Sequence, residues 1–521
     1  MIDTAALREK VLDLAIRGKL VSQDPNDEPA SVLLERIHEQ KLQMVREGKL
    51  KAKDVKDDTI IFKGDDNCYY EKYSDGSVKN IQDEIPFDLP AGWSWARGKN
   101  CFQEMKTRKP NGEEFVYIDI DAIDNKKNTI TNAKVLKVKD APSRACRYVK
   151  CGSVLFSLVR PYLKNIAFVE EKYASSIASS GFFVCTSTGV LYPRYSFYLM
   201  ISPYVVNGIN QFMKGDNSPS VSKSDIENWL YPIPPYNEQK QIVDCLNKTL
   251  AIIQNIHDTE NELQGEITSI KSKILELAIQ GKLVPQDEND EPASVLLERI
   301  RAERKEKLGK KYVESYIFKG DDNCYYEKIG KNNVNIAENI SFEIPSTWEI
   351  CRFESIVEMY TGNSINESDK AKKYTGLSDG YNYIATKDIS FNHTVNYDNG
   401  VKIPYGEPKF KIAYEGDPLL CIEGGSAGRK IAILSEDVCF VNKLCVFHSL
   451  GVNKKYLYYY LQSPQFCELF KKNTSGLIGG VSINTLKSLY FMLPPLSEQL
   501  RIVCAVEKVF SYIDEIEKGL N

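Results

Sequence analysis

A heptad pattern of apolar residues across residues 237–283 constrains the fold of this chain more than any other feature. Stepping alternately by four and three residues from position 242, nine of eleven positions are apolar. This spacing keeps one stripe on one side of an α-helix, and so long a stripe needs a partner helix with a matching stripe. We predict a helix roughly 65 Å long at 1.5 Å per residue, ending near Gly281. The eleven positions are Ile242, Leu246, Thr249, Ile253, Ile256, Glu260, Leu263, Ile267, Ile270, Ile274 and Leu277.

The partner of this helix is predicted to be divided between the two ends of the chain. The phrase Pro-Pro-x-x-Glu-Gln precedes the central helix at 234–239 and a similar stripe at 494–499, while Gly-Lys-Leu-Val follows an N-terminal stripe at 18–21 and the central helix at 281–284. The central helix therefore begins like the C-terminal helix and ends like the N-terminal helix. This arrangement predicts that the chain contains two copies of one unit. The stripe positions at the chain ends are Thr4, Leu7, Val11, Leu14, Ile502, Val506, Val509, Ile513 and Ile516.

The expected fold class is α+β, with two mixed α/β domains separated by two long antiparallel spacer helices in a pseudo-two-fold, circular arrangement. Short β-branched and aromatic runs broken by Gly, Asn and Asp predict strands within both domains. The expected strands are 115–120, 154–158, 166–169, 383–386, 419–422 and 430–434. The expected segments are a spacer helix and following helix (1–50), a first domain (51–236), the central spacer helix and following helix (237–310), a second domain (311–496) and a C-terminal spacer helix (497–521).

Two phrases are identical in both copies, whereas the domain bodies largely diverge. Residues 26–37 repeat as 289–300, and residues 61–72 repeat as 317–328. Pro29 and Pro292 suit the first turn of a helix, so a second helix is predicted in each copy. Duplication of a scaffold explains the identical phrases without any ligand. A repeated scaffold with varied domains is typical of a protein that has two different targets.

Length and composition indicate an ordinary multidomain protein. A chain of 521 residues exceeds one core, and 42% apolar with 26% charged residues is usual for globular proteins. No apolar run of about 18 residues predicts a membrane span, and the first residues lack the apolar core of a signal peptide. The 13 cysteines contain no C-x-x-C pair and the four histidines no H-x-x-x-H. We therefore expect a cytoplasmic location and no metal site.

The net charge of −4 conceals an uneven distribution. Residues 93–236 hold 19 Lys and Arg against 12 Asp and Glu, and residues 348–495 hold 16 against 15. A basic first domain beside acidic spacers fits a DNA-binding protein that also has a protein partner, although +7 also occurs in ordinary domains.

No catalytic motif is present. The sequence has no G-x-x-x-x-G-K-[ST] phosphate-binding loop. The run Ile233-Pro234-Pro235-Tyr236 is similar to the Asn-Pro-Pro-Tyr of amino-methyltransferases but lacks the amide that would hold a target amine. We interpret it as the start of a spacer helix. Catalytic, cofactor-binding and metal-binding residues are therefore not expected.

Basic residues near predicted strand ends are the candidate DNA contacts of the first domain. Arginine suits bidentate contacts with guanine and with phosphate, and Arg160 precedes Pro161 just after a predicted strand. A surface ion pair is the alternative for any one of these residues. The candidates are Arg108, Lys109, Arg144, Arg147, Arg160, Lys164 and Lys223.

The second domain has a glycine-rich run at the corresponding place, residues 414–429. Its glycines allow either close approach of the backbone to a partner or plain turns. Amides and amines of the adjoining residues can read base edges or phosphates, and can equally be solvated. The candidates here are Lys387, Arg429, Lys430, Asn442 and Lys443.

The arrangement resembles the specificity subunit of a type I restriction-modification enzyme over essentially the whole chain. The phrases that carry the resemblance are 222–239, 482–499 and the Gly-x-x-Leu-Phe-Ser-x-x-Arg-Pro-Tyr-Leu-Lys run ending at Lys164. In that family two variable target-recognition domains are joined by repeated helical spacers. The second domain has Gly-rich residues instead of Arg-Pro-Tyr, so the resemblance implies a different half-site for each domain.

The resemblance also implies partners and chemistry outside this chain. It implies double-stranded DNA, two copies of a modification subunit that methylates adenine, and restriction subunits that cleave DNA. S-adenosylmethionine, ATP and Mg would belong to those partner subunits, and this chain would not itself be an enzyme. The alternatives are a coiled-coil scaffold with two non-DNA recognition domains and a self-sufficient methyltransferase, which the missing motifs oppose.

Overall fold

The computed structural model describes residues 2–52, 55–309, 315–330, 332–336, 340, 343–476 and 479–519. The chain forms two compact units, the N-terminal unit (Met1–Glu260) and the C-terminal unit (Asn261–Asn521). The expected domain boundary between residues 310 and 311 lies outside the described residues. Within the described ranges, no helix combines the length and the apolar character needed to cross a membrane.

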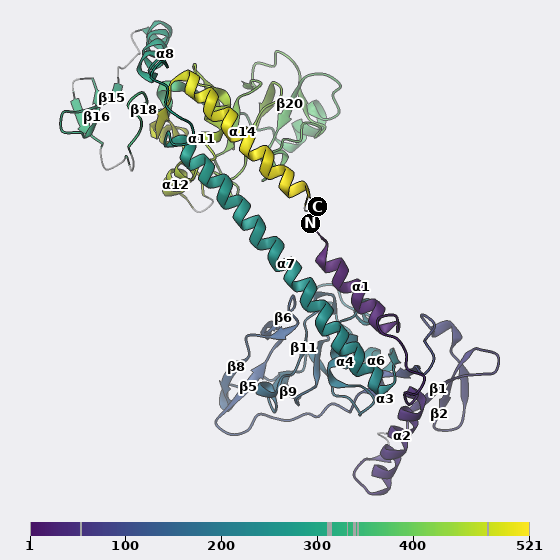
Figure 1. Ribbon diagram of the computed structural model, residues 1–521. Helices are drawn as coiled ribbons and strands as arrows, with labels where there is room; N and C mark the ends of the chain where they lie inside the picture. The colour runs from purple at the N-terminus through teal and green to yellow at the C-terminus, as the bar shows by residue number, and fades with distance from the viewer. Residues whose placement is uncertain are drawn as a thin grey trace. The chain divides into compact units, whose positions relative to one another are not determined.

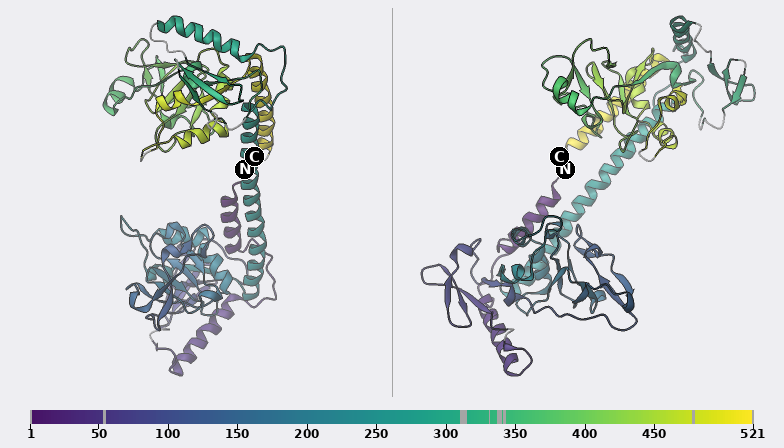
Figure 2. Two further views of the ribbon diagram at one scale, coloured as in Figure 1. Left: turned by 90° about the vertical axis from the view of Figure 1, so that its left-hand side faces the viewer. Right: turned by 180° about the vertical axis from the view of Figure 1, so that it is seen from behind.

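The long helix predicted from the heptads is α7 (Tyr236–Ile279). In the N-terminal unit, α1 (Thr4–Ile16) lies antiparallel beside it (Figures 1 and 2). The backbone N–H of Ile2 donates to Glu260 over 2.9 Å, and the Thr4 hydroxyl is 3.2 Å from Nδ1 of His257. The N-terminal part of the split partner is therefore confirmed.

In the C-terminal unit, α14 (Leu496–Gly519) lies antiparallel beside the second half of α7 (Figure 1). Gln264 donates to Glu517 over 3.1 Å, and Lys271 forms an ion pair with Asp514 over 2.9 Å. These contacts give the antiparallel direction, because Gln264, the earlier of the two residues in α7, meets Glu517, the later of the two in α14. The C-terminal part of the predicted partner is confirmed as well.

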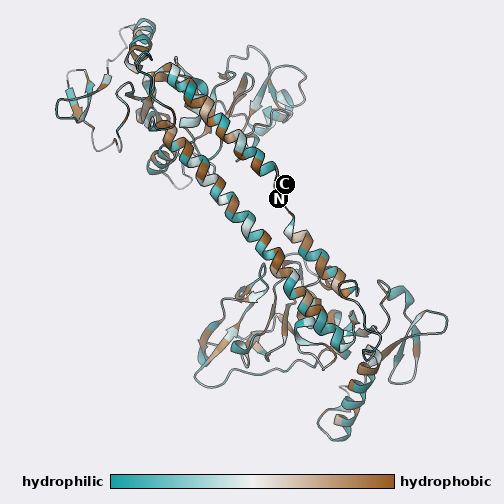
Figure 3. Cartoon of the chain, viewed as in Figure 1, coloured by the Kyte–Doolittle hydropathy of each residue, from teal (hydrophilic) through white to brown (hydrophobic). Residues whose placement is uncertain are grey.

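The heptad positions are only partly those that the helices bury. Ile242, Leu246, Ile253 and Ile267 are buried, and Figure 3 shows apolar segments recurring along α7. Three predicted positions are wrong, because Leu7, Ile270 and Ile516 are 38%, 47% and 57% exposed. A straight helix has 3.6 residues per turn, so its buried stripe drifts by about 20° for each strict heptad. This drift is largest at Ile270, four heptads after Ile242. The adjoining positions Arg8, Lys271 and Glu517 are half-buried instead.

Both α1 and α7 end at a glycine, as the Gly-Lys-Leu-Val repeat predicts. Gly18 and Gly281 have φ of 66° and 68°. The N–H groups of Lys19 and Lys282 donate back to the carbonyls of Leu14 and Leu277 over 2.9 Å. This left-handed turn satisfies carbonyls that the helix end would otherwise leave unpaired.

The Pro-Pro-x-x-Glu-Gln phrases start the spacer helices and attach them to the unit bodies. The indole N–H of Trp93 donates to buried Glu238 over 2.9 Å, and Trp348 contacts Glu498 in the same way over 2.8 Å. Gln239 accepts from the backbone N–H of Tyr192. Burial raises the pKa of both glutamates, while their hydrogen bonds to Trp and Gln side chains lower it in part.

The N-terminal unit contains two main sheets, ordered β8-β5-β12-β9 and β11-β10-β13. Most pairs are antiparallel, but β5 and β12 are parallel. The predicted strands in this domain are confirmed within two residues as β5, β10 and β11. The bounds are β4 (Ser94–Arg97), β5 (Glu114–Ile118), β6 (Ile123–Asp124), β7 (Thr129–Ile130), β8 (Lys134–Lys137), β9 (Ala145–Tyr148), β10 (Val154–Ser157), β11 (Ile166–Phe168), β12 (Ile177–Ser179), β13 (Phe182–Cys185), β14 (Leu230–Ile233), α3 (Gly98–Cys101), α4 (Pro193–Ile201), α5 (Pro203–Asn210) and α6 (Lys223–Asn228).

The C-terminal unit repeats this plan with sheets ordered β21-β20-β25-β22 and β19-β26-β23-β24. Here too one pair is parallel, β20 with β25. The predicted strands are confirmed within about two residues as β20, β23 and β24. The bounds are β18 (Glu349–Arg352), β19 (Val357–Thr361), β20 (Tyr381–Ile384), β21 (Lys402–Ile403), β22 (Ile412–Ala413), β23 (Pro418–Cys421), β24 (Ile431–Ile433), β25 (Val438–Phe440), β26 (Leu444–Ser449), β27 (Tyr490–Leu493), α9 (Phe353–Ile356), α10 (Glu367–Asp369), α11 (Lys454–Tyr460), α12 (Pro464–Lys472) and α13 (Ile483–Ser488).

The core of each unit has a helical layer followed by two sheets. Along β10, Val154 and Phe156 pack in the cluster that contains α1, α4 and the start of α7, whereas Leu155 packs in the cluster between the sheets. Successive side chains of a strand point to opposite faces. Leu420 and Leu419 of β23 alternate in the same way. Strands covered on both faces explain why these runs are continuously apolar.

A helix and a small three-stranded sheet precede each unit body and contain the identical phrases. The first phrase opens α2 (Ala30–Arg46) or α8 (Ala293–Leu308), which confirms the helices predicted after Pro29 and Pro292. The second phrase forms most of an antiparallel hairpin in both units. The strands are β1 (Thr59–Lys63), β2 (Tyr69–Tyr73), β3 (Val78–Asn80), β15 (Ser315–Lys319), β16 (Tyr325–Ile329) and β17 (Asn332–Asn335).

Candidate nucleic-acid interface

The loops after β10 and β23 are held by the same backbone hydrogen bonds in the two units. Arg160 N–H donates to the carbonyl of Pro219 over 2.8 Å, and Gly424 N–H donates to Gly479 over 2.9 Å. Next to these bonds, Val159 bridges Ser220 and Glu423 bridges Gly480. Position 160 of the first unit therefore corresponds to position 424 of the second. This common frame presents loops of different sequence.

Arg160 has a left-handed backbone, with φ of 47°. That conformation costs a non-glycine residue roughly 1 kcal/mol or more, and its counterpart Gly424, with φ of 90°, adopts it freely. The side chain of Arg160 is exposed and donates to the carbonyl of Asn217 over 2.9 Å. Local strain of this kind concentrates at functional sites, which supports Arg160 as a contact residue.

Four other candidates in the N-terminal unit lie along the β9 edge of its four-stranded sheet, β8-β5-β12-β9. Arg108, Lys109 and Arg144 are exposed, and Arg147 is half-buried on β9. Backbone N–H of Arg108 donates to Cys146 over 2.9 Å, and its guanidinium lies 5.2 Å from the ring centre of Tyr148. The carbonyl of Arg144 accepts from Ser180, beside the loop after β10. The structure thus brings these arginines to neighbouring loops.

Two predicted residues are engaged in ion pairs. Lys164 lies 2.6 Å from Glu9 of α1, and Lys223 lies 2.8 Å from Glu104 and 3.1 Å from Glu227. These carboxylates neutralise the charge that a phosphate would otherwise meet. Both lysines therefore form surface ion pairs, which is the alternative to a role in DNA contact.

In the C-terminal unit the five candidates lie on adjoining loops. The ammonium of Lys430 donates to the carbonyl of Thr386, next to Lys387, over 3.0 Å. The carbonyl of Lys443 accepts from Ile422 at the end of β23 over 3.0 Å. Four of the candidates are exposed, namely Lys387, Arg429, Asn442 and Lys443. Residues separated by more than 50 positions in the sequence thus form one polar surface.

Phe391 was missed by the sequence analysis. It is 59% exposed, and the cationic groups of Arg429 and Lys430 lie 5.3 Å and 5.1 Å from its ring centre. An exposed ring that holds two cations fixes their position without neutralising them. The only signal in the sequence was a lone aromatic residue after a short predicted strand.

A hollow of about 550 Å³ opens beside this surface. Asn442 and Glu423 line it together with Thr361 and parts of the segment 475–482. Amides suit adenine edges and carboxylates can accept from the cytosine amine. The counterparts of Glu423 and Asn442 in the N-terminal unit are Val159 and Ser180. The two units therefore offer different chemistry at one position of the frame.

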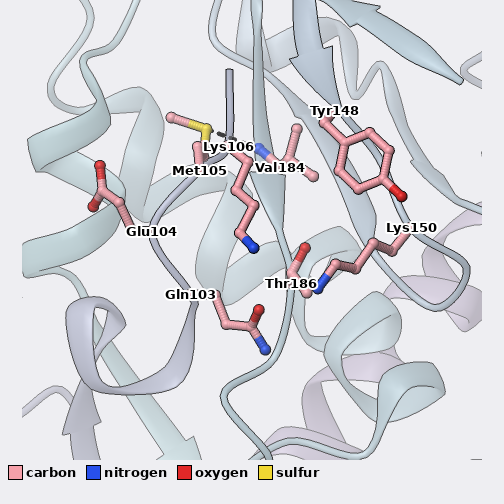
Figure 4. Close-up of a pocket in the computed structure, with 8 residues that line it drawn as sticks. All are labelled: Gln103, Glu104, Met105, Lys106, Tyr148, Lys150, Val184 and Thr186. Carbon is pink, nitrogen blue, oxygen red and sulfur yellow. Dashed lines mark hydrogen bonds between the residues drawn. The ribbon is translucent and has the colours of Figure 1, made fainter. Parts of the chain in front are cut away.

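Two further lysines lie at a small pocket of the N-terminal unit that the sequence analysis did not select. Figure 4 shows the side chains of Lys106 and Lys150 extending to the same side of the pocket as Thr186. The pocket measures about 10 Å³, which holds one water molecule at most. Tyr148 N–H donates to the carbonyl of Lys106 over 3.1 Å, so both lysines adjoin Arg108. They enlarge the basic edge of this unit.

Two units with one frame and different polar loops define a modular recognition protein. The chain belongs to a family of DNA specificity proteins, because the model for the type I restriction modification DNA specificity domain matches residues 101–265 and 345–521. As expected from the resemblance, it is a specificity protein and not one of the catalytic subunits.

Named relatives agree with this family. The chain is 26% identical to the specificity subunit of the type I restriction enzyme EcoEI of Escherichia coli, covering 99% of this chain and 90% of that protein. The EcoAI specificity subunit of Escherichia coli is also 26% identical, over 98% and 90%. A chain from a solved structure of the type I R-M system has 22% identity and a TM-score of 0.53, covering 83% of this chain and 94% of that one. That likeness supports the fold.

Proposed function

We propose that this chain is the DNA-recognition subunit of a type I restriction-modification complex and reads a bipartite, asymmetric site. One half-site is read by the loops of the N-terminal unit and the other by those of the C-terminal unit. The observation that carries the proposal is the common hydrogen-bonded frame, which presents Arg160 in one unit and Gly424, Glu423 and Asn442 in the other. Arginine favours guanine, whereas amides and carboxylates favour adenine and cytosine.

The proposed partners are double-stranded DNA, two copies of a modification subunit and restriction subunits, in the cytoplasm. Adenine methylation and ATP-dependent cleavage belong to those subunits, together with S-adenosylmethionine, ATP and Mg. The two spacer pairs would complete a pseudo-two-fold, circular arrangement. The half-sites would then lie in inverted orientation on the duplex, with one methylated adenine on each strand and unread bases between the halves.

Exchange of one domain tests whether each unit reads its own half-site. Residues 93–236 are replaced by the corresponding domain of another specificity subunit, the complex is assembled with its modification subunits, and methylated bases are mapped by sequencing a methylated genome. The expected result is a motif with one half changed and the other half and the gap preserved. Replacement of residues 348–495 is the matched exchange and should change the opposite half. A continuous palindromic motif, or a motif rewritten in both halves, contradicts the proposal.

A further inference from the structure

The two small sheets that contain the second identical phrase present the same surface twice in one chain. We call them hairpin modules, strands β1 to β3 in the N-terminal unit and β15 to β17 in the C-terminal unit. Residues 61–72 and 317–328 agree at all twelve positions. Both phrases lie outside residues 101–265 and 345–521, which the family model matches.

The fold explains part of this identity. Added to Gly64, a Cβ would lie 2.9 Å from the Tyr70 ring, and Gly320 is equally restricted by Tyr326. Asn67 has φ of 64° in the hairpin turn. Buried Glu71 forms an ion pair with Arg97 over 2.8 Å. Substitution at these positions would disturb the hairpin or its attachment in either unit.

Exposed positions in the phrase are not explained in this way. Asp65 and Asp321, at the tips of the hairpins, are exposed and have no hydrogen bond or ion pair to any described residue. Phe62 is 41% exposed and stacks on Tyr70, 5.9 Å between ring centres. Phe318 is half-buried, and it stacks on Tyr326 with the same distance and interplanar angle. The two modules therefore agree in surface chemistry as well as in backbone.

Duplication alone does not account for this pattern, because the neighbouring sequence has diverged. Residues 38–60 and 301–316, which precede the two copies, differ in both length and sequence. The third strands also differ, since Val78 of β3 corresponds to Asn333 of β17. Identity thus resumes over residues 61–72 and 317–328 after a stretch that has diverged, which points to a requirement that applies equally to both modules.

We propose that the hairpin tips are docking sites for two copies of one partner protein. The inference rests on the proposed function, in which that partner is the modification subunit. Two identical surfaces on a single chain fit two identical partners, whereas the divergent loops fit two different half-sites. The adjacent acidic residues Asp65 and Asp66 repel phosphate, which favours protein over DNA as the ligand. The partner surface would offer a basic group to Asp65 or Asp321 and an apolar contact to Phe62 or Phe318.

Charge reversal combined with loss of the ring tests the docking sites in the full-length chain. The paired variants are Phe62→Ala with Asp65→Lys, Phe318→Ala with Asp321→Lys, and all four together. The matched control is Val78→Asn, which places the residue of the other module at a 53% exposed position on the same sheet. Partner copies per chain are counted by native mass spectrometry with purified modification subunit, and affinity is measured by titration. Melting temperatures check folding.

The wild type and the Val78→Asn variant should bind two copies. Each paired variant should retain one tight site and weaken the other about tenfold or more, and the fourfold variant should weaken both. Two copies bound with unchanged affinity by the fourfold variant would overturn the docking sites while leaving the proposed function intact. If the fourfold variant bound DNA more weakly but kept its affinity for the partner, the docking sites would also be overturned, and the hairpin tips would be assigned to nucleic-acid contact. A wild-type chain that binds no modification subunit would refute the proposed function itself and this inference with it.

Discussion

The guanidinium of Arg160 donates a hydrogen bond to the carbonyl oxygen of Asn217 over 2.9 Å. This bond joins the loop after β10 to the segment that precedes α6, and the Arg160 N–H joins the same loops through Pro219. Two links from one residue hold its strained backbone in place. The side chain is thus held in place in the free chain, which would lower the ordering cost of the DNA contact that we propose for it.

Arg160→Ala should weaken specific DNA binding by the assembled complex by about 1–3 kcal/mol, the usual value of a good base contact. Assembly should be unchanged because the residue is exposed. Arg160→Gly is the matched variant, since it removes the same side chain but relieves the left-handed strain, and it should be neutral or stabilise by up to about 1 kcal/mol. Binding isotherms and melting temperatures measure both. Cognate affinity equal to wild type would exclude Arg160 as a contact.

Arg429→Ala should likewise weaken cognate binding by about 1–3 kcal/mol. Lys164→Ala is the control at the corresponding position of the other unit, because Ser157 N–H donates to the carbonyl of Asn165 as Cys421 N–H donates to that of Lys430. The charge of Lys164 is already paired with Glu9. That exposed pair contributes about 0–1 kcal/mol, so this variant should have the smaller effect on binding. Titrations at several salt concentrations separate two kinds of contact. A uniform loss on all sequences with a shallower salt slope would assign Arg429 to phosphate rather than to a base.

Glu238→Gln should change the pH dependence of stability. Burial raises the pKa of the Glu238 carboxyl, so the folded state binds this proton more tightly than the unfolded chain. The resulting contribution to stability is complete below the ordinary glutamate pKa of about 4.3 and is lost as pH rises through the raised value. Because glutamine does not titrate, the melting temperature of the variant should rise relative to wild type over that interval. Glu498→Gln should behave in the same way, whereas parallel profiles would contradict the assigned shift.

Gly281→Ala should destabilise the C-terminal unit by about 2 kcal/mol or more. Its φ of 68° disfavours a side chain, and an added Cβ would lie 2.4 Å from Cγ of Pro345. Gly265→Ala within α7 is the control, because its Cβ would meet nothing within 4 Å. That change should stabilise by roughly 0.5–1 kcal/mol through helix propensity. Thermal unfolding compares them, and equal effects of the two substitutions would be inconsistent with the C-terminal turn described above.

Insertion of about four residues, one helical turn, after Glu260 should change the gap in the methylated motif and keep both halves. A longer α7 would alter both the distance and the angular phase between the two recognition units. Both quantities matter on a duplex that turns once in about 10 base pairs. Mapping of methylated bases measures the gap. An unchanged gap in an active complex would show that α7 does not set the spacing.

The heptads and repeated phrases by themselves determined the long helix, its split partner, the duplicated plan and the glycine stops. The long helix and its glycine stops depend on neighbours within a few turns, where periodicity and turn chemistry act directly. The split partner and the duplicated plan were visible because the same phrases recur at matching helix boundaries. The sequence also placed six strands within about two residues, because short runs of β-branched and aromatic residues are bounded by turn residues.

Only the tertiary structure decided which charged residues are available to a ligand. Lys164 is paired by Glu9, 155 positions away, whereas Arg429 at the corresponding position lies over Phe391. No local pattern encodes such pairings, because they depend on how distant strands and helices pack. The same reason explains why Leu7, Ile270 and Ile516 are exposed despite their heptad spacing. A helix of 3.6 residues per turn moves its buried face away from a strict heptad, and its neighbours determine where that face lies.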